Sequence, residues 1–174
     1  MPKEPPFKTT TMTVLMTPDM ANFSGHVHGG AILRLLDQVA YACAARYSGC
    51  YVVTVSVDQV TFRKPVFVGE LVTFRSSVNY TGTTSMEIGV RVEAEDVRER
   101  TSRHVITCYF TMVAVDEAGK PVPVEPVRIV TPVEKRRWAA AQLRREFRRE
   151  VERRNLEIRH HPEDLIGGES VDPD

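Results

Sequence analysis

Cysteines are few in this sequence, and long apolar runs are missing. The three cysteines, Cys43, Cys50 and Cys108, are odd in number and form no CxxC pair. A disulfide framework or a zinc site is therefore not expected, and a reducing compartment is favoured. The N-terminal residues MPKEPPFKTT lack the apolar core of a signal peptide, and no stretch approaches the ~18 apolar residues of a membrane span. These absences predict a cytoplasmic protein that does not bind membranes.

An excess of charge of either sign is also missing. Lys and Arg total 23 of the 174 residues, and Asp and Glu also total 23, so the formal net charge is zero. This balance argues against a general nucleic-acid binder, but it leaves room for a local basic patch that holds a phosphorylated ligand. The GxSxG motif of serine hydrolases, the P-loop and GxGxxG do not occur either. A serine-hydrolase mechanism therefore has little support.

Hydrophobic periodicity predicts one long helix and five strands. Apolar residues recur with helical spacing from Ile32 to Tyr47, and Gly49 can end this helix in the left-handed conformation. The apolar stripe covers more than half of the helix circumference, so a curved sheet must wrap around it. In the strand that ends at Phe62 the alternation changes register, which predicts a bulge near Asp58–Gln59. The expected strands are 9–16, 53–62, 72–80, 86–94 and 104–115, which together with the helix give an α+β fold.

The chain is expected to divide into five segments: a flexible N-terminus at 1–8, the main domain at 9–124, a Pro-rich linker at 125–133, a charged helix at 134–161 and a disordered tail at 162–174. In the charged helix, Leu143, Phe147 and Val151 give a narrow apolar stripe, which favours a solvated helix docked along one seam. A basic surface for a membrane or a nucleic acid is the alternative, but interleaved glutamates dilute its field.

Asp37 is the most informative candidate for chemistry. It lies in mid-helix at the flank of the apolar stripe, beside Leu33 and Ala44 on a helical wheel. A carboxylate among apolar neighbours is costly to bury unless it has a partner. Such a group can act as a general base or a nucleophile. The alternative is a carboxylate that reaches water or caps a neighbouring loop.

Amide donors precede the same helix. Asn22 lies in the loop NFSGHVHGG, and Gly29 and Gly30 lie at the helix start, where the helix dipole is positive. Such donors can stabilise a developing oxyanion, so the segment suits attack on a carbonyl. Asn22 as an ordinary turn residue is the alternative. His26 and His28 form an HxH pair, but no third ligand has convincing spacing, so no metal is expected.

Two turns contain candidate contacts for a phosphorylated ligand. Arg63 and Lys64 follow a strand, and Thr84 and Ser85 lie in a hairpin that contains Gly82. These side chains could hold phosphates or amide groups at the mouth of a cleft. Surface turns are often basic or rich in hydroxyl groups without any function.

The run NFSGHVHGGAILRLLDQVAYACAARYSG resembles the signature of the hot-dog acyl-CoA thioesterases, of the YciA and brain acyl-CoA hydrolase types. The later segments VVTVSVDQVTFRKPVFVGELV, GTTSMEIGVRVEAE and CYFTMVAVDEAGKPVPV are similar to strands of the same family in the same order. Together they cover roughly residues 9–124. Several segments that match in order are more specific than any single one.

The resemblance implies a helix wrapped by a five-stranded antiparallel sheet, which dimerises into a ten-stranded sheet, and trimers of such dimers in many members. It implies that acyl-CoA is the substrate, that no cofactor is needed, and that Asp37 and Asn22 are the catalytic residues, supplied by opposite chains. Arg63 and Lys64 are then expected near the CoA phosphates, and Thr84 and Ser85 along the pantetheine arm. A hot-dog dehydratase or hydratase, which would need His28 as its histidine, and a non-catalytic acyl-CoA sensor are the alternatives.

Overall fold

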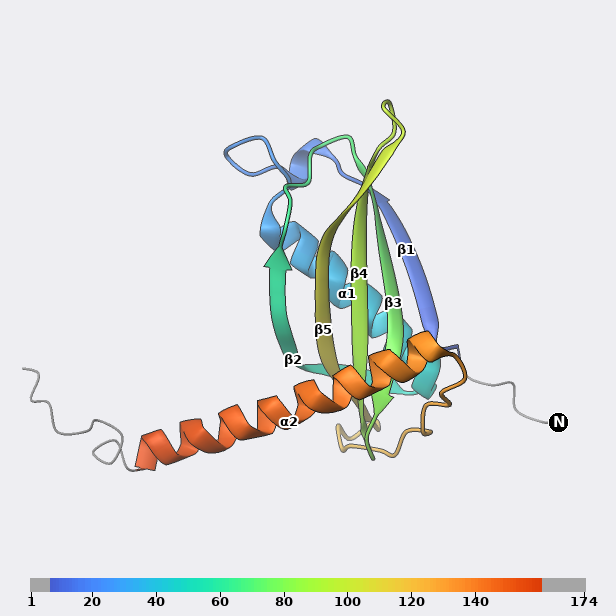
Figure 1. Ribbon diagram of the computed structural model, residues 1–174, viewed down its shortest axis with the longest axis vertical. Helices are drawn as coiled ribbons and strands as arrows, with labels where there is room; N and C mark the ends of the chain where they lie inside the picture. Colours follow the sequence, from blue (N-terminus) through green and yellow to red (C-terminus); the bar gives the residue numbers. More distant parts are fainter. Residues whose placement is uncertain (1–6, 161–174) are drawn as a thin grey trace, which may run out of the picture.

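The computed structural model describes residues 7–160, and it contains one sheet with a helix on each face (Figure 1). The sheet has five strands in the order β1-β3-β4-β5-β2, and every neighbouring pair is antiparallel. The predicted fold is therefore confirmed. The elements in chain order are β1 (Thr9–Leu15), the 3-10 turn η1 (Pro18–Met20), α1 (Gly29–Ser48), β2 (Tyr51–Phe62), β3 (Leu71–Thr81), β4 (Ser85–Asp96), β5 (Thr101–Val115) and α2 (Pro132–His160).

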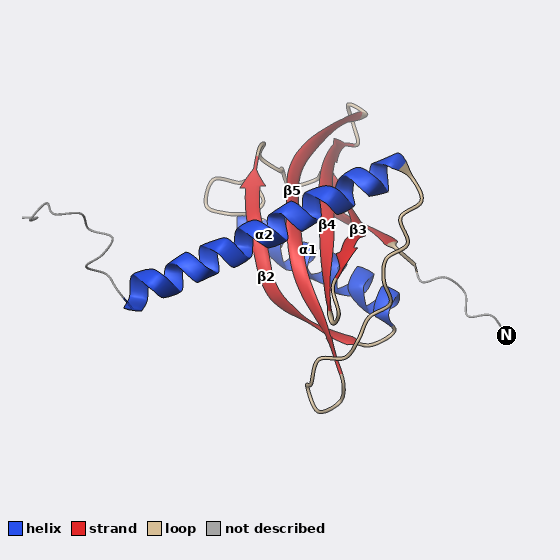
Figure 2. Ribbon diagram, turned by 60° about the horizontal axis from the view of Figure 1, so that its bottom comes forward, coloured by secondary structure: helices blue, strands red, loops and turns tan. Residues whose placement is uncertain are grey.

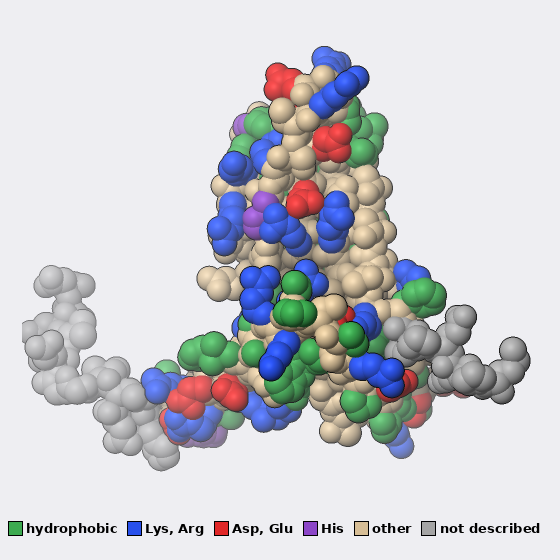
Figure 3. Space-filling view, turned by 45° about the vertical axis from the view of Figure 1, so that its right-hand side comes forward, with side chains coloured by type: hydrophobic (Ala, Val, Ile, Leu, Met, Phe, Trp, Pro, Cys, Tyr) green, Lys and Arg blue, Asp and Glu red, His purple; other side chains and the backbone are tan. Residues whose placement is uncertain are grey.

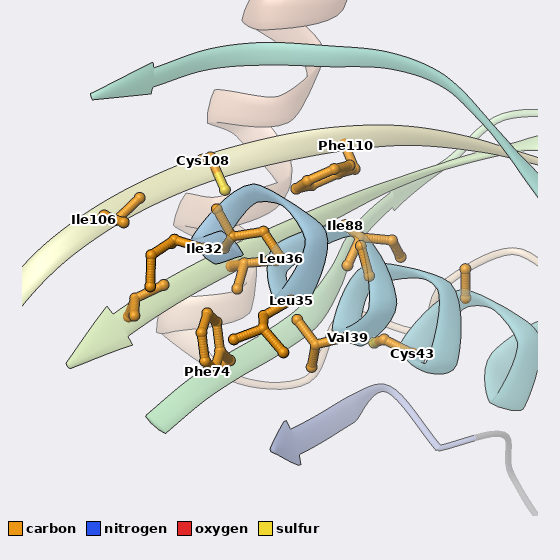
Figure 4. Packing of buried hydrophobic residues seen from close by; sticks show 14 of the residues in the cluster. Ile32, Leu35, Leu36, Val39, Cys43, Phe74, Ile88, Ile106, Cys108 and Phe110 are labelled. Atoms are coloured by element: carbon orange, nitrogen blue, oxygen red, sulfur yellow. The ribbon is translucent and has the colours of Figure 1, made fainter. Parts of the chain in front are cut away.

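Helix α1 fills the concave face of the sheet. It ends at Gly49, whose φ of 68° is the left-handed conformation predicted from the sequence. Figure 4 shows the apolar side chains of α1 pointing at those of β3, β4 and β5. Leu36, Phe74 and Phe110 are at most 1% exposed, and burying such a side chain contributes roughly 1.5–3 kcal/mol. This contact fixes α1, and with it every side chain on its flanks.

Strand β2 is an edge of the sheet, because it pairs only with β5. The predicted bulge is confirmed: the register shifts between Asp58 and Thr61, and Gln59 has a φ of 34°. A second shift, between Thr54 and Ser56, gave no signal in the sequence. Apolar side chains stay exposed along this edge strand: Tyr51 62%, Val53 38%, Val55 62% and Val57 46%. An exposed apolar edge strand is a ready site for pairing with another strand.

Helix α2 crosses the outer, convex face of the sheet (Figure 2). Thr131 and Glu134 form a capping box at its start, since the Glu134 N–H donates to Thr131 Oγ1 and the Thr131 N–H donates to Glu134 Oε2. Two arginines of the helix form ion pairs with the sheet. Arg144 makes hydrogen bonds of 2.6 and 3.1 Å to the buried carboxylate of Glu87, and Arg148 pairs with Asp58.

The stripe predicted to dock α2 does not contact the sheet as expected. Leu143, Phe147 and Val151 are 53%, 60% and 56% exposed. The docked face instead contains Ala141, 1% exposed, and Arg144, whose guanidinium lies 3.5 Å from the ring centroid of Tyr109. The docked face of α2 therefore contains Arg144, which pairs with Glu87, and not the narrow apolar stripe. Glu87 lies 57 positions away in the sequence, so the helical pattern of α2 alone cannot reveal this pair.

Two expectations fall mainly outside residues 7–160: the flexible N-terminus at 1–8 and the disordered tail at 162–174. Within the described part of the chain, neither helix combines the length and apolar character needed to cross a bilayer.

Candidate functional site

Asp37 lies where α1 faces the edge strand. Its Oδ1 accepts a hydrogen bond of 2.7 Å from the Thr54 hydroxyl on β2. In the single chain this carboxylate is exposed, which matches the alternative in which it reaches water and not a carboxylate buried within one subunit. The wheel position is right nonetheless: Leu33 and Tyr41, one turn to either side, are 40% and 39% exposed. The carboxylate therefore sits in an apolar, open strip along the unpaired edge of the sheet.

Aromatic side chains extend this strip. Tyr41 and Tyr51 meet edge to face, with ring centroids 5.9 Å apart. At the other end, the Phe62 ring lies over the start of α1, because a Cβ on Gly29 would approach its Cζ at 3.5 Å. Tyr51 and Phe62 are 62% and 46% exposed. One side of the strip is thus available to a long apolar ligand.

The start of α1 offers amide hydrogens, although not both of those predicted. His28 is the N-cap, and its Nδ1 accepts a 2.8 Å hydrogen bond from the Gly30 N–H. The Gly30 donor is therefore already engaged. The Gly29 N–H has no acceptor within residues 7–160, and it lies at the N-terminus of α1, which is the positive end of the helix dipole. His28 is held as a cap, which disfavours it as the acid–base histidine of a dehydratase.

Asn22 holds its own loop through its side-chain oxygen. Oδ1 accepts hydrogen bonds from the N–H groups of Ser24 (2.9 Å) and His26 (3.1 Å). With the oxygen used in this way, the two N–H donors of the amide are left to face a ligand. The same loop closes with a 2.7 Å hydrogen bond from the Asn22 N–H to the His26 carbonyl. A short turn thus fixes the amide in one orientation.

The four predicted CoA contacts do not come together in one chain. Arg63 and Lys64 follow Phe62, which pairs with Ile106 on β5, whereas Ser85 pairs with Val113 on the same strand. Ile106 and Val113 are seven residues apart along β5, which corresponds to roughly 23 Å. Ser85 also lines the groove under α2, on the face of the sheet opposite to α1. The turn positions gave no sign of this, because the strand order places the two turns at opposite ends.

Nucleophilic chemistry at the two buried cysteines, and metal chemistry within the described residues, find no support. Burial raises the pKa of the Cys43 thiol, and it raises the pKa of Cys108 to about 12. Neither thiol forms a nucleophilic thiolate near neutral pH. No group of three His, Cys, Asp or Glu side chains within residues 7–160 is placed to hold a metal ion.

Thr54 is the site residue that the sequence did not reveal. Within β2 it looks like any hydroxyl residue that alternates with valines. Its hydrogen bond to Asp37 joins residues 17 positions apart. Only the packing of α1 against β2 identifies it, although a rule that seeks a hydroxyl partner for a mid-helix carboxylate could have proposed it.

One helix wrapped by a five-stranded antiparallel sheet defines the hot-dog class, and this chain has a carboxylate on the helix flank at the free edge of that sheet. The thioesterase superfamily model matches residues 24–101. Protein VdlD of Helicobacter pylori is 50% identical over 79% of this chain and 78% of its own length.

Solved structures agree with this comparison. A hexameric acyl-CoA thioesterase has a TM-score of 0.80 at 36% identity, covering 82% of this chain and 92% of that one. An acyl-CoA hydrolase from Staphylococcus aureus, solved with butyryl coenzyme A and coenzyme A, has a TM-score of 0.77 at 31% identity, covering 86% and 93%. The chain belongs to the hot-dog acyl-CoA thioesterase family.

Proposed function

We propose that this protein hydrolyses acyl-CoA thioesters to a free acid and CoA, at a site shared by two copies of the chain. The observation on which this rests is the pair formed by Asp37 and Thr54 on the unpaired edge of the sheet. A carboxylate there is open to solvent in one subunit and would be enclosed once a second β2 strand pairs with the first. Asn22 of the opposite subunit then completes the site.

The Staphylococcus aureus hydrolase supports this choice of residues. An asparagine, an aspartate and a threonine of that enzyme have each been replaced by alanine in solved structures. Their position numbers differ by 15 and then by 17. Asn22, Asp37 and Thr54 have the same two separations. The agreement supports a role for all three residues, including the threonine that the sequence alone did not single out.

The chemistry follows from the groups at the site. The amide of Asn22 and the Gly29 N–H polarise the thioester carbonyl, and the Thr54 hydroxyl orients the Asp37 carboxylate. Asp37 acts in one of two ways: it takes a proton from the attacking water, or it attacks the carbonyl itself and forms an anhydride that water then cleaves. In both cases the C–S bond breaks, and the CoA sulfur leaves as a thiolate that takes up a proton. Thioesters are already activated, so the mechanism needs no cofactor.

The proposed position of the CoA moiety follows from where Thr54 lies along the sheet. Thr54 pairs with Met112, which lies between the level of Phe62 and that of Ser85 on β5. A nucleotide that leaves the site past Phe62 reaches Arg63 and Lys64, so these two residues remain the proposed phosphate contacts. Thr84 and Ser85 lie beyond the thioester in the other direction, so they would reach the pantetheine arm only from a partner subunit.

We propose a homodimer with β2 paired to β2 in a ten-stranded sheet, assembled further into a trimer of dimers, in the cytoplasm. The similar thioesterase described as hexameric supports the oligomer. The exposed valines of β2 support the choice of this edge. No nucleic-acid or membrane partner is proposed.

Mixing two inactive variants tests the shared site. Asn22→Ala and Asp37→Ala chains are dissociated, mixed in equal amounts and reassociated, and CoA release from several acyl-CoAs is measured. A hybrid dimer then contains one site with both native residues, so about a quarter of the wild-type activity should return. If chain exchange is verified by mass and the activity does not return, each site is built within one chain. Acyl-CoA binding without CoA release by the wild type would instead indicate a sensor.

A further inference from the structure

One flank of α2 is apolar and uncovered along much of the helix. At 3.6 residues per turn, Phe147, Val151 and Ile158 fall within about 40° of one another, roughly a quarter turn from Ala141, which faces the sheet. They are 60%, 56% and 48% exposed. The opposite flank holds Gln142, Glu146, Arg149 and Arg153, and Arg153 is paired with Glu150 and Glu157. A helix that is polar on one side and apolar on the other faces two different surroundings.

The C-terminal part of α2 extends beyond the edge of its own sheet. Val151 lines both grooves beside the helix, together with Val55 in one and Val57 in the other, so it lies over the edge strand β2. Nine more residues follow to His160, which at 1.5 Å per residue is about 13 Å of helix past the last strand. Figures 1 and 2 both show this overhang from different directions. Asn155, Leu156 and Arg159 still line one groove together with Val55 of the same subunit, but the helix axis continues past the edge of the sheet.

We propose that α2 packs antiparallel against α2 of a second copy of this chain, across the seam where two β2 strands pair. The inference rests on the proposed pairing of subunits along β2. A two-fold axis perpendicular to the sheet turns each overhang onto the outer face of the other subunit's sheet. The same axis brings the same flank of both helices together, as an isologous contact requires.

The apolar flank is the one that faces this axis. Phe147 and Val151 line the groove of about 840 Å³ on the side of Thr61 and Arg63, toward the far end of β2. The second copy of α2 would lie in that groove, against Val57. Green side chains interrupt the blue ones in Figure 3 low on the molecule, where α2 crosses the sheet. The charged flank turns away from the axis.

The spacing of strands and helix residues sets the register of the helix pair. The axis lies half a strand spacing beyond β2, about 2.4 Å, which is roughly one to two helix residues past Val151. Val151 then lies near its own counterpart, and Phe147 lies opposite Ile158. Both pairings join apolar residues that are exposed in the single subunit. The contact therefore has a definite alignment that a cross-link can detect.

A cysteine at the predicted axis tests the pairing. Val151→Cys is made in a Cys50→Ser background, beside a matched Arg149→Cys variant on the charged flank, and both are oxidised without substrate. The Val151→Cys chain should form a disulfide-linked dimer on a non-reducing gel, and the Arg149→Cys chain only traces. Equal cross-linking of both variants overturns the proposal. The lack of a cross-link in Val151→Cys also overturns the proposal. The native mass then separates two cases: dimers mean that only the helix contact is wrong, whereas monomers mean that the β2 pairing is wrong as well.

A charge in the contact provides a second measurement. Phe147→Glu should raise the dimer dissociation constant about tenfold, or about 1.4 kcal/mol, in sedimentation experiments, whereas Gln142→Glu on the other flank should change it less than about twofold. Phe147 is largely exposed in the subunit, so the fold should be retained, which far-UV circular dichroism checks. Equal dissociation constants for the two variants contradict the helix pairing. At protein concentrations that keep Phe147→Glu dimeric, CoA release should persist, because the proposed catalytic residues lie on the other face.

Discussion

The two helices cover opposite faces of one sheet and are held there by different forces. Helix α1 lies on the concave face through a broad apolar stripe whose members, such as Leu36 and Val39, are almost fully buried. Helix α2 lies on the convex face and has a single fully buried residue, Ala141. It is held by arginines, and Arg144 reaches the carboxylate of Glu87, which is 3% exposed. Apolar packing fixes α1 in one place, whereas α2 depends on a few specific ion pairs.

This difference separates the chemistry from the assembly. A proposed catalytic carboxylate must stay within a fraction of an ångström of its partners, and a rigid, densely packed helix provides that. The polar attachment of α2 leaves a second flank exposed, where the contact with another subunit is proposed. Four variants, each with a matched control or a titration, test whether the two helices have separate roles.

Asp37→Ala should lower the rate of acyl-CoA hydrolysis by about 10²–10⁴-fold, because it removes the proposed base or nucleophile. The thermal unfolding temperature should change little, because the side chain is exposed and has one hydrogen bond. Turnover is measured by thiol release under saturating substrate. Thr54→Val is the companion variant and should cause a smaller loss, since it leaves the carboxylate in place without its orienting hydroxyl. Normal turnover by Asp37→Ala would remove Asp37 from the mechanism.

Leu36→Ala should destabilise the whole domain by about 4 kcal/mol, because Leu36 is 0% exposed at the centre of the α1–sheet contact. Chemical denaturation gives the free energy of unfolding. Hydrogen exchange should become faster throughout the sheet and α1 together. Leu143→Ala is the matched control, because the same truncation on the exposed flank of α2 should cost well under 1 kcal/mol in the isolated subunit. Similar losses for the two variants would contradict the distinction between the helices.

Arg144→Ala should weaken the docking of α2 by about 3 kcal/mol, because it leaves the buried carboxylate of Glu87 without its cation. Compared with the wild type, we expect faster hydrogen exchange in α2 and little change of the exchange rates in α1. Replacing both partners by methionine should restore most of the protection, since no unpaired charge remains. Arg153→Ala, which removes two exposed ion pairs within the helix, should change the exchange hardly at all. Equal effects of Arg144→Ala on the two helices would show that they unfold as one unit.

Glu134→Gln should remove a smaller, pH-dependent contribution of about 1 kcal/mol at neutral pH. Hydrogen bonds from Lys8 and from the N–H groups of Thr131 and Val130 lower the pKa of Glu134 from 4.5 to about 2. A lowered pKa stabilises the fold above the unfolded value and loses that effect as the pH falls toward 2. Glutamine can keep the capping box, so the variant isolates the charge. The difference in unfolding free energy between wild type and variant should shrink from pH 5 to pH 3, and a constant difference would contradict this assignment.

The sequence predicted the elements better than their contacts. The helix that ends at Gly49, the five strands and the bulge at Gln59 all followed from local periodicity, and the structure has them. The helical pattern predicts a start of α2 at 134, whereas the helix begins at Pro132. Thr131-Pro132-Val133-Glu134 contains both a capping box and a proline at the first helical position, and these local signals indicate the earlier start. The hydroxyl beside Asp37 and the carboxylate beneath Arg144 had no comparable signal, because their partners lie 17 and 57 residues away.

Local sequence patterns are sufficient to predict which segments are helix or strand and which of their faces are apolar, since these properties depend on neighbours a few residues apart. They also predict that Asp37 lies at the border of the apolar stripe of α1. Only the tertiary structure decided that β2 is an edge of the sheet, that Thr54 meets Asp37, and that the apolar flank of α2 stays uncovered. These features need the order of the strands and the path of α2, which are set by packing between distant segments.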